Sequence, residues 1–240
     1  MQLLFIRHGQ SVNNAFWEIH NNSSHFHLDP ELTELGRQQA GYLARALTAP
    51  AAATEPPAWD LQNLAGFGIT HIYTSPMTRA VQTAEIINEC LSLPLHVWLD
   101  LHEEGGLCLD DPESGEPIGQ PGPPRSYFTN RFPSLLLTDD FPENGWWNRP
   151  WETMLQRSQR AQRFAAELRI RHPDPADRVA LVSHGGFYNR LIAALFGLPE
   201  NRAWWLPLNN TALSRIDILP TETHLIYHNR LDHLPRDLAS

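Results

Sequence analysis

Short apolar runs alternate with longer amphipathic segments along the chain. Continuous apolar runs at residues 2–6 and 178–184 are typical of strands that are covered on both faces. Two further runs, "ITHIYTSP" at 69–76 and "LPLHVWLDLHEE" at 93–104, predict strands of the same sheet. Near the C-terminus, "LSRIDIL" and "THLIYHNR" flank "PTET" and predict an antiparallel hairpin.

The segments between these runs place apolar residues every three or four positions, which predicts helices. The predicted helices run from Asp29-Pro30 or Thr33 to about Leu47, and over 77–91, 151–171 and 186–197. In 151–171 the arginines mostly lie off the apolar stripe, so we expect them to solvate one face of the helix. Two segments without a clear period, the polar 15–30 and the Pro- and Ala-rich 48–60, predict loops.

Alternating strands and helices predict a three-layer α/β/α sandwich with a mainly parallel sheet. A chain of 240 residues with 42% hydrophobic content can form one substantial core. We therefore expect a single domain over residues 1–240. Residues 105–150 are rich in Gly and Pro and predict a cap inserted into that domain.

The charge balance narrows the classes of partner. The chain carries 27 Asp and Glu against 18 Lys and Arg, a net charge of −9, which disfavours nucleic acid or an anionic membrane surface as a partner. No apolar run approaches the roughly 20 residues of a membrane helix. The first residues also lack the pattern of a secretory signal, so we expect a cytoplasmic protein.

Metal and redox motifs are not evident in the sequence. Its two cysteines, Cys90 and Cys108, form no CxxC pair. His20, His25 and His27 have no standard metal spacing and predict a polar loop. We expect no metal and no cofactor.

Candidate chemistry follows the apolar runs at their carboxyl ends. One run ends in Arg7, His8 and Gly9, and another ends in Ser183, His184 and Gly185. In an open parallel sheet, ligands bind beyond the carboxyl ends of the strands. If these two strands are neighbours, about 4.8 Å apart, both imidazoles can reach one ligand atom. The two glycines would let the backbone approach that ligand, because they have no Cβ.

Two further features fall at the same edge. The turn "TSPMTR" brings Arg79 into the first turn of a helix, where free N–H groups favour an anion, and Glu103 and Glu104 follow another predicted strand. Guanidinium groups match phosphate oxygens in pairs. Arginines, histidines and a helix terminus together predict a phosphate pocket.

These motifs carry a resemblance to a known family. The chain resembles the histidine phosphatase superfamily, also called the phosphoglycerate mutase-like family, over nearly its whole length and in the family's order. The matching segments are "RHGQSVNN" at 7–14, "LTELGRQQA" at 32–40, "TSPMTRAVQTAE" at 74–85, "LHEE" at 101–104, "LVSHGG" at 181–186 and "NNTALSRI" at 209–216.

The resemblance implies a role for each residue of the pocket. His8 is the expected nucleophile, which forms a phosphohistidine as a neutral imidazole. Its other ring nitrogen should then donate to a backbone carbonyl. Arg7, Arg79 and His184, with Gly185 beside them, are expected to bind the phosphoryl oxygens and stabilise the transition state.

Two assignments leave alternatives open. Asn14 matches the family's asparagine that reaches the phosphate, although an asparagine here can equally cap a helix. Glu103 is the expected proton donor to the leaving group, and Glu104 remains the alternative. Arg125, Arg131 and Arg149 in the insert are expected to be solvated, with contact to a second anionic group of the substrate as the other possibility.

The implied activity is hydrolysis of a small phosphorylated metabolite. One alternative is a phosphoglycerate mutase, but mutases of the family resemble each other in a basic "RHYG"-like stretch after the acid. Here "EGGLCLDDPESGEP" follows Glu103 and is acidic. Another alternative is a phospho-ligand binding protein without turnover. The sequence leaves the natural substrate and the oligomeric state open.

Overall fold

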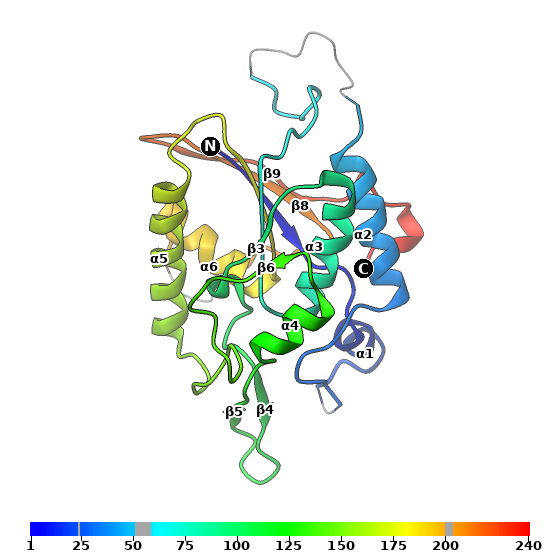
Figure 1. Ribbon diagram of the computed structural model, residues 1–240, viewed down its shortest axis with the longest axis vertical. Helices are drawn as coiled ribbons and strands as arrows, with labels where there is room; N and C mark the ends of the chain where they lie inside the picture. The colour runs from blue at the N-terminus through cyan, green and yellow to red at the C-terminus, as the bar shows by residue number, and fades with distance from the viewer. Residues whose placement is uncertain (24, 51–58, 200–203) are drawn as a thin grey trace.

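The structure is a computed structural model that describes residues 1–23, 25–50, 59–199 and 204–240. Most of the loop predicted at 48–60 lies outside the described residues. Figure 1 shows a central sheet with helices on either side, as the sequence predicted. In the described part of the chain, no helix combines the length and apolar character needed to cross a bilayer.

The central sheet has seven strands in the order β6-β3-β2-β7-β1-β8-β9. The five strands from β6 to β1 pair in parallel, whereas β8 and β9 pair antiparallel at the other edge. The strands are β1 (Gln2–Arg7), β2 (His71–Thr74), β3 (Leu95–Val97), β6 (Leu135–Leu136), β7 (Arg178–Ser183), β8 (Leu213–Ile218) and β9 (Thr223–Arg230).

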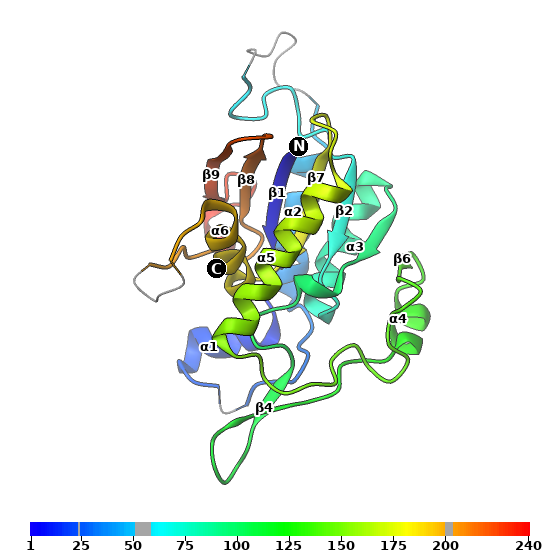
Figure 2. The same ribbon diagram turned by 90° about the vertical axis from the view of Figure 1, so that its left-hand side faces the viewer.

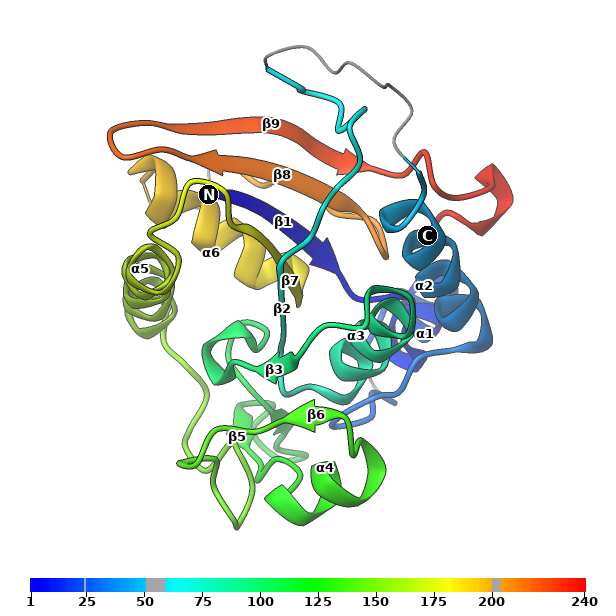
Figure 3. The same ribbon diagram turned by 45° about the horizontal axis from the view of Figure 1, so that its top comes forward.

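Helices cover both faces of this sheet. The helices are α1 (Val12–His20), α2 (Glu34–Leu47), α3 (Thr78–Leu91), α4 (Arg125–Arg131), α5 (Met154–Arg171) and α6 (Gly185–Phe196). Alternate residues of β1 point to opposite faces: Leu4 and Ile6 pack with α2 and α3, whereas Leu3 and Phe5 pack with α5 and α6. Figure 3 shows these two helix pairs on opposite sides of the sheet. The three-layer prediction is therefore confirmed.

Residues 105–150 contain their own small elements. A hairpin of β4 (Cys108–Asp110) and β5 (Pro117–Gly119) stands out from the body of the protein in Figure 1. Beyond α4, β6 pairs with β3 and so extends the central sheet. Phe128 and Trp147 are fully buried in the same apolar cluster as α2 and α3. Much of this segment is thus built into the core.

Two of the predicted elements were wrong. The first part of the loop expected at 15–30 belongs to α1. Its apolar residues Val12, Ala15, Phe16 and Ile19 recur at helical spacing, although the helix buries none of its residues. A capping box between Ser11 and Asn14 starts this helix. The strand expected at 93–104 ends at Val97, and a 3₁₀ turn over Leu99–Leu101 follows.

The expectation for the arginines of α5 was also wrong at two positions. Arg157 is 8% exposed and Arg160 is fully buried. Both side chains reach the segment that carries Glu103 and Glu104, through contacts described below. In Figure 2 the beginning of α5 lies at the same end of the molecule as α1 and the β4–β5 hairpin. This is also the end at which the parallel strands finish.

Candidate active site

The two histidines that end the apolar runs lie close together. β1 and β7 pair in parallel with Arg7 opposite Ser183, so the expected pairing of these strands is confirmed. The residues that follow, His8 and His184, have ring centroids 5.0 Å apart. Both side chains are buried, His8 with 3% and His184 with 0% of its surface exposed.

The ring of His8 is held in one orientation and one protonation state. Its Nδ1 lies 2.7 Å from the carbonyl oxygen of Gly9, and its Nε2 lies 3.1 Å from Nε of Arg79. Arg79 can only donate, so Nε2 carries the lone pair and Nδ1 carries the proton. Burial, with Arg79 and Arg7 nearby, lowers the pKa of His8 well below its usual 6.5. The imidazole is therefore neutral, as a nucleophile must be.

Arg79 lies in the first turn of α3, as the sequence predicted. The carboxylate of Asp29 caps this helix end by accepting from the Thr78 backbone N–H at 3.0 Å and the Thr78 hydroxyl at 2.7 Å. One N–H expected to attract an anion is thus already occupied. Arg7 donates through Nη1 to the carbonyl of Leu208, which fixes the guanidinium beside the site.

His184 has a polar atom without a partner. Its Nε2 lies 2.8 Å from the hydroxyl of Ser75, which in turn accepts from the Met77 N–H at 3.2 Å. That hydroxyl can then give its own proton to Nε2, which leaves the ring proton on Nδ1. No described residue accepts a hydrogen bond from Nδ1. A buried donor of this kind is costly without an acceptor, and a phosphoryl oxygen would supply one.

The two glycines beside the histidines, Gly9 and Gly185, have different surroundings. A Cβ on Gly9 would overlap the backbone carbonyl of Gly36 at the start of α2. Our expectation that Gly9 makes room for a ligand was therefore wrong, because it makes room for α2. A Cβ on Gly185 would meet no heavy atom of the described residues within 4 Å, so this backbone faces open space.

The N-terminal end of α6 binds the carboxylate of Glu103. Its Oε1 accepts from the N–H groups of Phe187 at 2.9 Å and of Glu104 at 2.8 Å, and its Oε2 accepts from Gly186 at 3.2 Å. Helix N-termini favour carboxylates in this position. Any side chain on Gly186 would collide with this carboxylate. Among the described residues, backbone groups alone therefore fix Glu103.

Glu104 is held differently, by two arginines. Its carboxylate pairs with Arg157 at 3.3 Å and with Arg190 of α6. Both arginine side chains are only 10% exposed. Its charge is therefore compensated within the protein.

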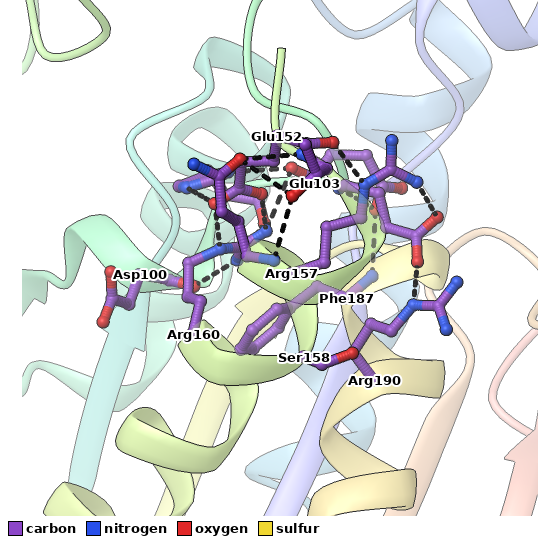
Figure 4. A network of polar contacts seen from close by, with 12 residues as sticks. Asp100, Glu103, Glu152, Arg157, Ser158, Arg160, Phe187 and Arg190 are labelled. Carbon is purple, nitrogen blue, oxygen red and sulfur yellow. Dashed lines mark hydrogen bonds and ion pairs between the residues drawn. The ribbon is translucent and has the colours of Figure 1, made fainter. Parts of the chain in front are cut away.

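A buried arginine supports the segment that carries both glutamates. Arg160 donates through Nη1 to the carbonyl oxygens of Asp100 at 2.7 Å and His102 at 2.9 Å. Its Nε and Nη2 make a paired contact with Glu152 at 3.0 and 2.8 Å. Figure 4 shows Arg160, Asp100 and Glu152 in the same network of polar contacts as Glu103. The arginine therefore satisfies carbonyl oxygens of a segment that lies beyond the end of β3.

A cavity of about 400 Å³ opens onto these groups. Arg7, His8, Arg79 and both glutamates line it, whereas His184 does not. Asn14 also lines it, and its Oδ1 accepts from the Ser11 N–H at 3.1 Å. Both interpretations of Asn14 are thus compatible with the structure, because the cap uses Oδ1 and leaves the amide N–H groups of the side chain for a ligand.

Sequence reasoning missed several supporting residues. Ser75 bonds His184 directly, whereas Asp29 bonds Thr78, the neighbour of Arg79, and Arg160 bonds the carbonyl of His102, the neighbour of Glu103. Ser75 stands inside the motif "TSPMTR" and could have been proposed from it. No local pattern signals the other two, because their partners lie 49 and 58 positions away in the sequence.

One cluster of potential metal ligands exists among the described residues. His71, His172 and Asp177 place ligand atoms within 4.8 Å of one another, at the amino ends of β2 and β7 and thus far from the cavity. Both ring nitrogens of His172 already have partners, Asp177 at 2.9 Å and the Tyr73 hydroxyl at 3.1 Å. Hydrogen bonding accounts for this cluster.

Comparisons with known proteins agree with the geometry. The family model of the histidine phosphatase superfamily (branch 1) matches residues 3–54, 60–116 and 121–230. Probable phosphoglycerate mutase GpmB of Yersinia enterocolitica is 29% identical over 217 residues, which cover 90% of this chain and 85% of that protein.

Two solved structures share the fold. Alpha-ribazole phosphatase from Shigella flexneri has a TM-score of 0.61 and 23% identity, with 96% of both chains covered. Phosphoserine phosphatase from Entamoeba histolytica in complex with 3-phosphoglyceric acid has a TM-score of 0.60 and 18% identity, with 98% of this chain and 99% of that chain covered. With the family match over most of the chain, these findings make the protein a member of the histidine phosphatase superfamily.

Proposed function

We propose that the protein hydrolyses phosphomonoesters of small metabolites through a phosphohistidine on His8. The observation that carries this proposal is the state of the His8 ring, with the proton on Nδ1 fixed by Gly9 and the lone pair on Nε2 beside Arg79. A buried neutral imidazole next to two arginines has little use in folding. It is suited to attack an anion that both arginines bind.

In the first step, Nε2 of His8 attacks phosphorus and the bond from phosphorus to the ester oxygen breaks. Arg7 and Arg79 neutralise charge on the phosphoryl oxygens. His184 lies behind the cavity lining, with its ring 5.0 Å from that of His8, and its Nδ1–H donates to a phosphoryl oxygen once the group is bound at His8. The leaving oxygen takes a proton from Glu103. Preorganised donors of this kind are usually the largest contribution to such a reaction.

In the second step, water attacks the phosphohistidine. Glu103 now accepts a proton from that water, the bond between phosphorus and Nε2 breaks, and inorganic phosphate leaves. The same carboxyl group thus serves as acid and then as base. Its Oε2 accepts one long hydrogen bond while Oε1 accepts two short ones, so we assign the transferred proton to Oε2.

Glu103 is a better candidate for this role than Glu104. Both line the cavity, but Glu104 is engaged by Arg157 and Arg190. A proton on Glu104 would break two ion pairs in a largely buried place, which is costly. Within the described structure Glu103 accepts hydrogen bonds from backbone groups only. A proton on it would weaken its attraction to Arg7 and Arg79 but would break no direct ion pair.

A phosphoglycerate mutase is the second candidate, because the relative from Yersinia enterocolitica carries that name. A mutase would have to hold an additional phosphoryl or carboxylate group. The lysines and arginines that line the cavity, among the described residues, are Arg7 and Arg79 alone. Both are used by the reacting phosphoryl group, so hydrolysis is the better supported activity.

The test is turnover of p-nitrophenyl phosphate by the wild type and by His8→Ala. We expect release of phosphate that the substitution lowers by several orders of magnitude. Interconversion of 2- and 3-phosphoglycerate without release of phosphate would instead support the mutase. Binding of phosphate esters without turnover would support the non-catalytic alternative and overturn the proposal.

A further inference from the structure

The cavity is much larger than a phosphoryl group, and its outer part differs in character from the inner part. Beyond the arginines and glutamates, the lining includes polar residues such as Asn13 and His27 and a group of five aromatic and apolar side chains. These five are Trp17, Phe26, Leu28, Pro30 and Trp151. We call this set the aromatic wall. The leaving group of a bound ester would have to lie against it, since the phosphoryl group occupies the end with His8.

The residues of the aromatic wall belong to two parts of the chain. Contacts within each part hold these side chains in place. Trp17 belongs to α1, and Phe26 lies in the loop after it, with the two rings in edge contact at 6.3 Å between centroids. Asn13 fastens that loop to the helix through two hydrogen bonds of 2.9 Å with the backbone of His27. Trp151 directly follows the insert, with Arg157 over its ring at 4.9 Å.

Exposure of these rings has a cost that folding alone does not explain. Trp17 is 48% exposed, and α1 buries none of its residues. Apolar surface that converges on a cavity beside catalytic groups is typical of a ligand site. A flat ring placed there would remove this surface from water and stack against it.

The charges around the cavity disfavour leaving groups that carry a carboxylate or a second phosphate. Arg125 and Arg131 of the insert pair with Glu143 at 3.0 Å and Glu31 at 2.7 Å, and neither lines the cavity. Arg149 stacks on Trp147 at 4.3 Å and also lies outside the lining. A carboxylate or second phosphate on the substrate would therefore meet aromatic rings, Glu103 and His27. Among the described lining residues no arginine or lysine is present besides Arg7 and Arg79.

We infer that the natural substrate is a phosphate monoester whose alcohol part is uncharged and carries a flat apolar ring, such as an arene or heteroaromatic group. This inference rests on the proposed function and adds the class of substrate to it. The aromatic wall binds the ring. The described lining holds no arginine or lysine besides Arg7 and Arg79, which disfavours phosphoglycerate and phosphoserine.

The test compares esters that share a primary alkyl oxygen as leaving group: 2-(1-naphthyl)ethyl phosphate, butyl phosphate and a carboxylate-bearing member, 3-phosphoglycerate. We expect kcat/KM to be about tenfold higher for the naphthyl ester than for butyl phosphate, and lowest for 3-phosphoglycerate. Trp17→Ala should reduce the preference for the naphthyl ester severalfold. Trp59→Ala, at a tryptophan that is 58% exposed and lies outside the cavity, serves as the matched control and should change nothing.

A preference for 3-phosphoglycerate, or an equal loss on all esters in Trp17→Ala, would overturn the inference. Binding of the same esters to His8→Ala, measured by calorimetry, tests the aromatic wall without turnover. If the wild type releases phosphate from none of them and none from p-nitrophenyl phosphate, the proposed function fails. The order of the dissociation constants then still supports or contradicts the aromatic subsite.

Discussion

The buried pair of Arg160 and Glu152 gives the sharpest prediction about stability. Arg160 is fully buried, and the Glu152 side chain is 6% exposed. Glu152→Gln keeps the shape of the side chain but leaves the guanidinium without its counter-charge. Breaking one partner of a buried pair costs about 3–5 kcal/mol. For a chain of this size that corresponds to a fall of roughly 6–20 °C in Tm.

The same helix offers a matched control. Arg171 and Glu167 also pair on α5, but both side chains are 41% exposed. Glu167→Gln should cost only about 0.3–0.5 kcal/mol. Urea unfolding followed by tryptophan fluorescence would measure both free energies of unfolding under one protocol. A difference of less than about 1 kcal/mol between the two variants would refute the idea that this pair secures the Glu103 segment.

Three further predictions concern the proton donor, the buried histidines and the glycines. Glu103→Gln should slow butyl phosphate far more than p-nitrophenyl phosphate, whose leaving group needs little protonation; equal losses would remove Glu103 from that role. Burial lowers the pKa of His8, His102 and His184 well below 6.5, so below pH 6.5 the unfolded state binds more protons and the free energy of unfolding falls. Each such histidine contributes about 1.4 kcal/mol per pH unit, and urea titrations at pH 7 and 5.5 should show a smaller fall for His184→Asn than for the wild type. Gly9→Ala should lower the free energy of unfolding by roughly 1–3 kcal/mol, because its Cβ overlaps Gly36. Gly185→Ala should change that free energy by no more than about 0.5 kcal/mol. Similar values for the two variants would contradict our account of Gly9.

The parts of the fold that could be predicted from the sequence depend on local patterns. The apolar runs that end at Arg7 and Ser183 predicted two buried parallel strands, and these proved to be neighbours. Their pairing is what brings His8 and His184 to one place. The capped start of α2 at Thr33 was likewise one of the two predicted starts.

The parts that could not be predicted depend on distant partners. Nothing near Arg160 in the sequence indicates that it binds carbonyl groups of the Asp100–His102 segment, so it was mistaken for a solvated residue. The choice between Glu103 and Glu104 was open for the same reason. It depends on the end of α6, whose N–H groups reach Glu103, and on Arg190, which reaches Glu104. Helix α1, by contrast, carries apolar residues at helical spacing, Val12, Ala15, Phe16 and Ile19, and could have been predicted from them.

The central claim is that His8 carries the phosphoryl group during turnover. The most direct measurement mixes the enzyme rapidly with p-nitrophenyl phosphate, quenches it in alkali, where phosphohistidine survives, and maps the modified peptide by mass spectrometry. Our account predicts one phosphoryl group on the peptide that contains His8, and none in His8→Ala. A phosphoryl group on His184, or turnover with no modified histidine at any mixing time, would contradict it.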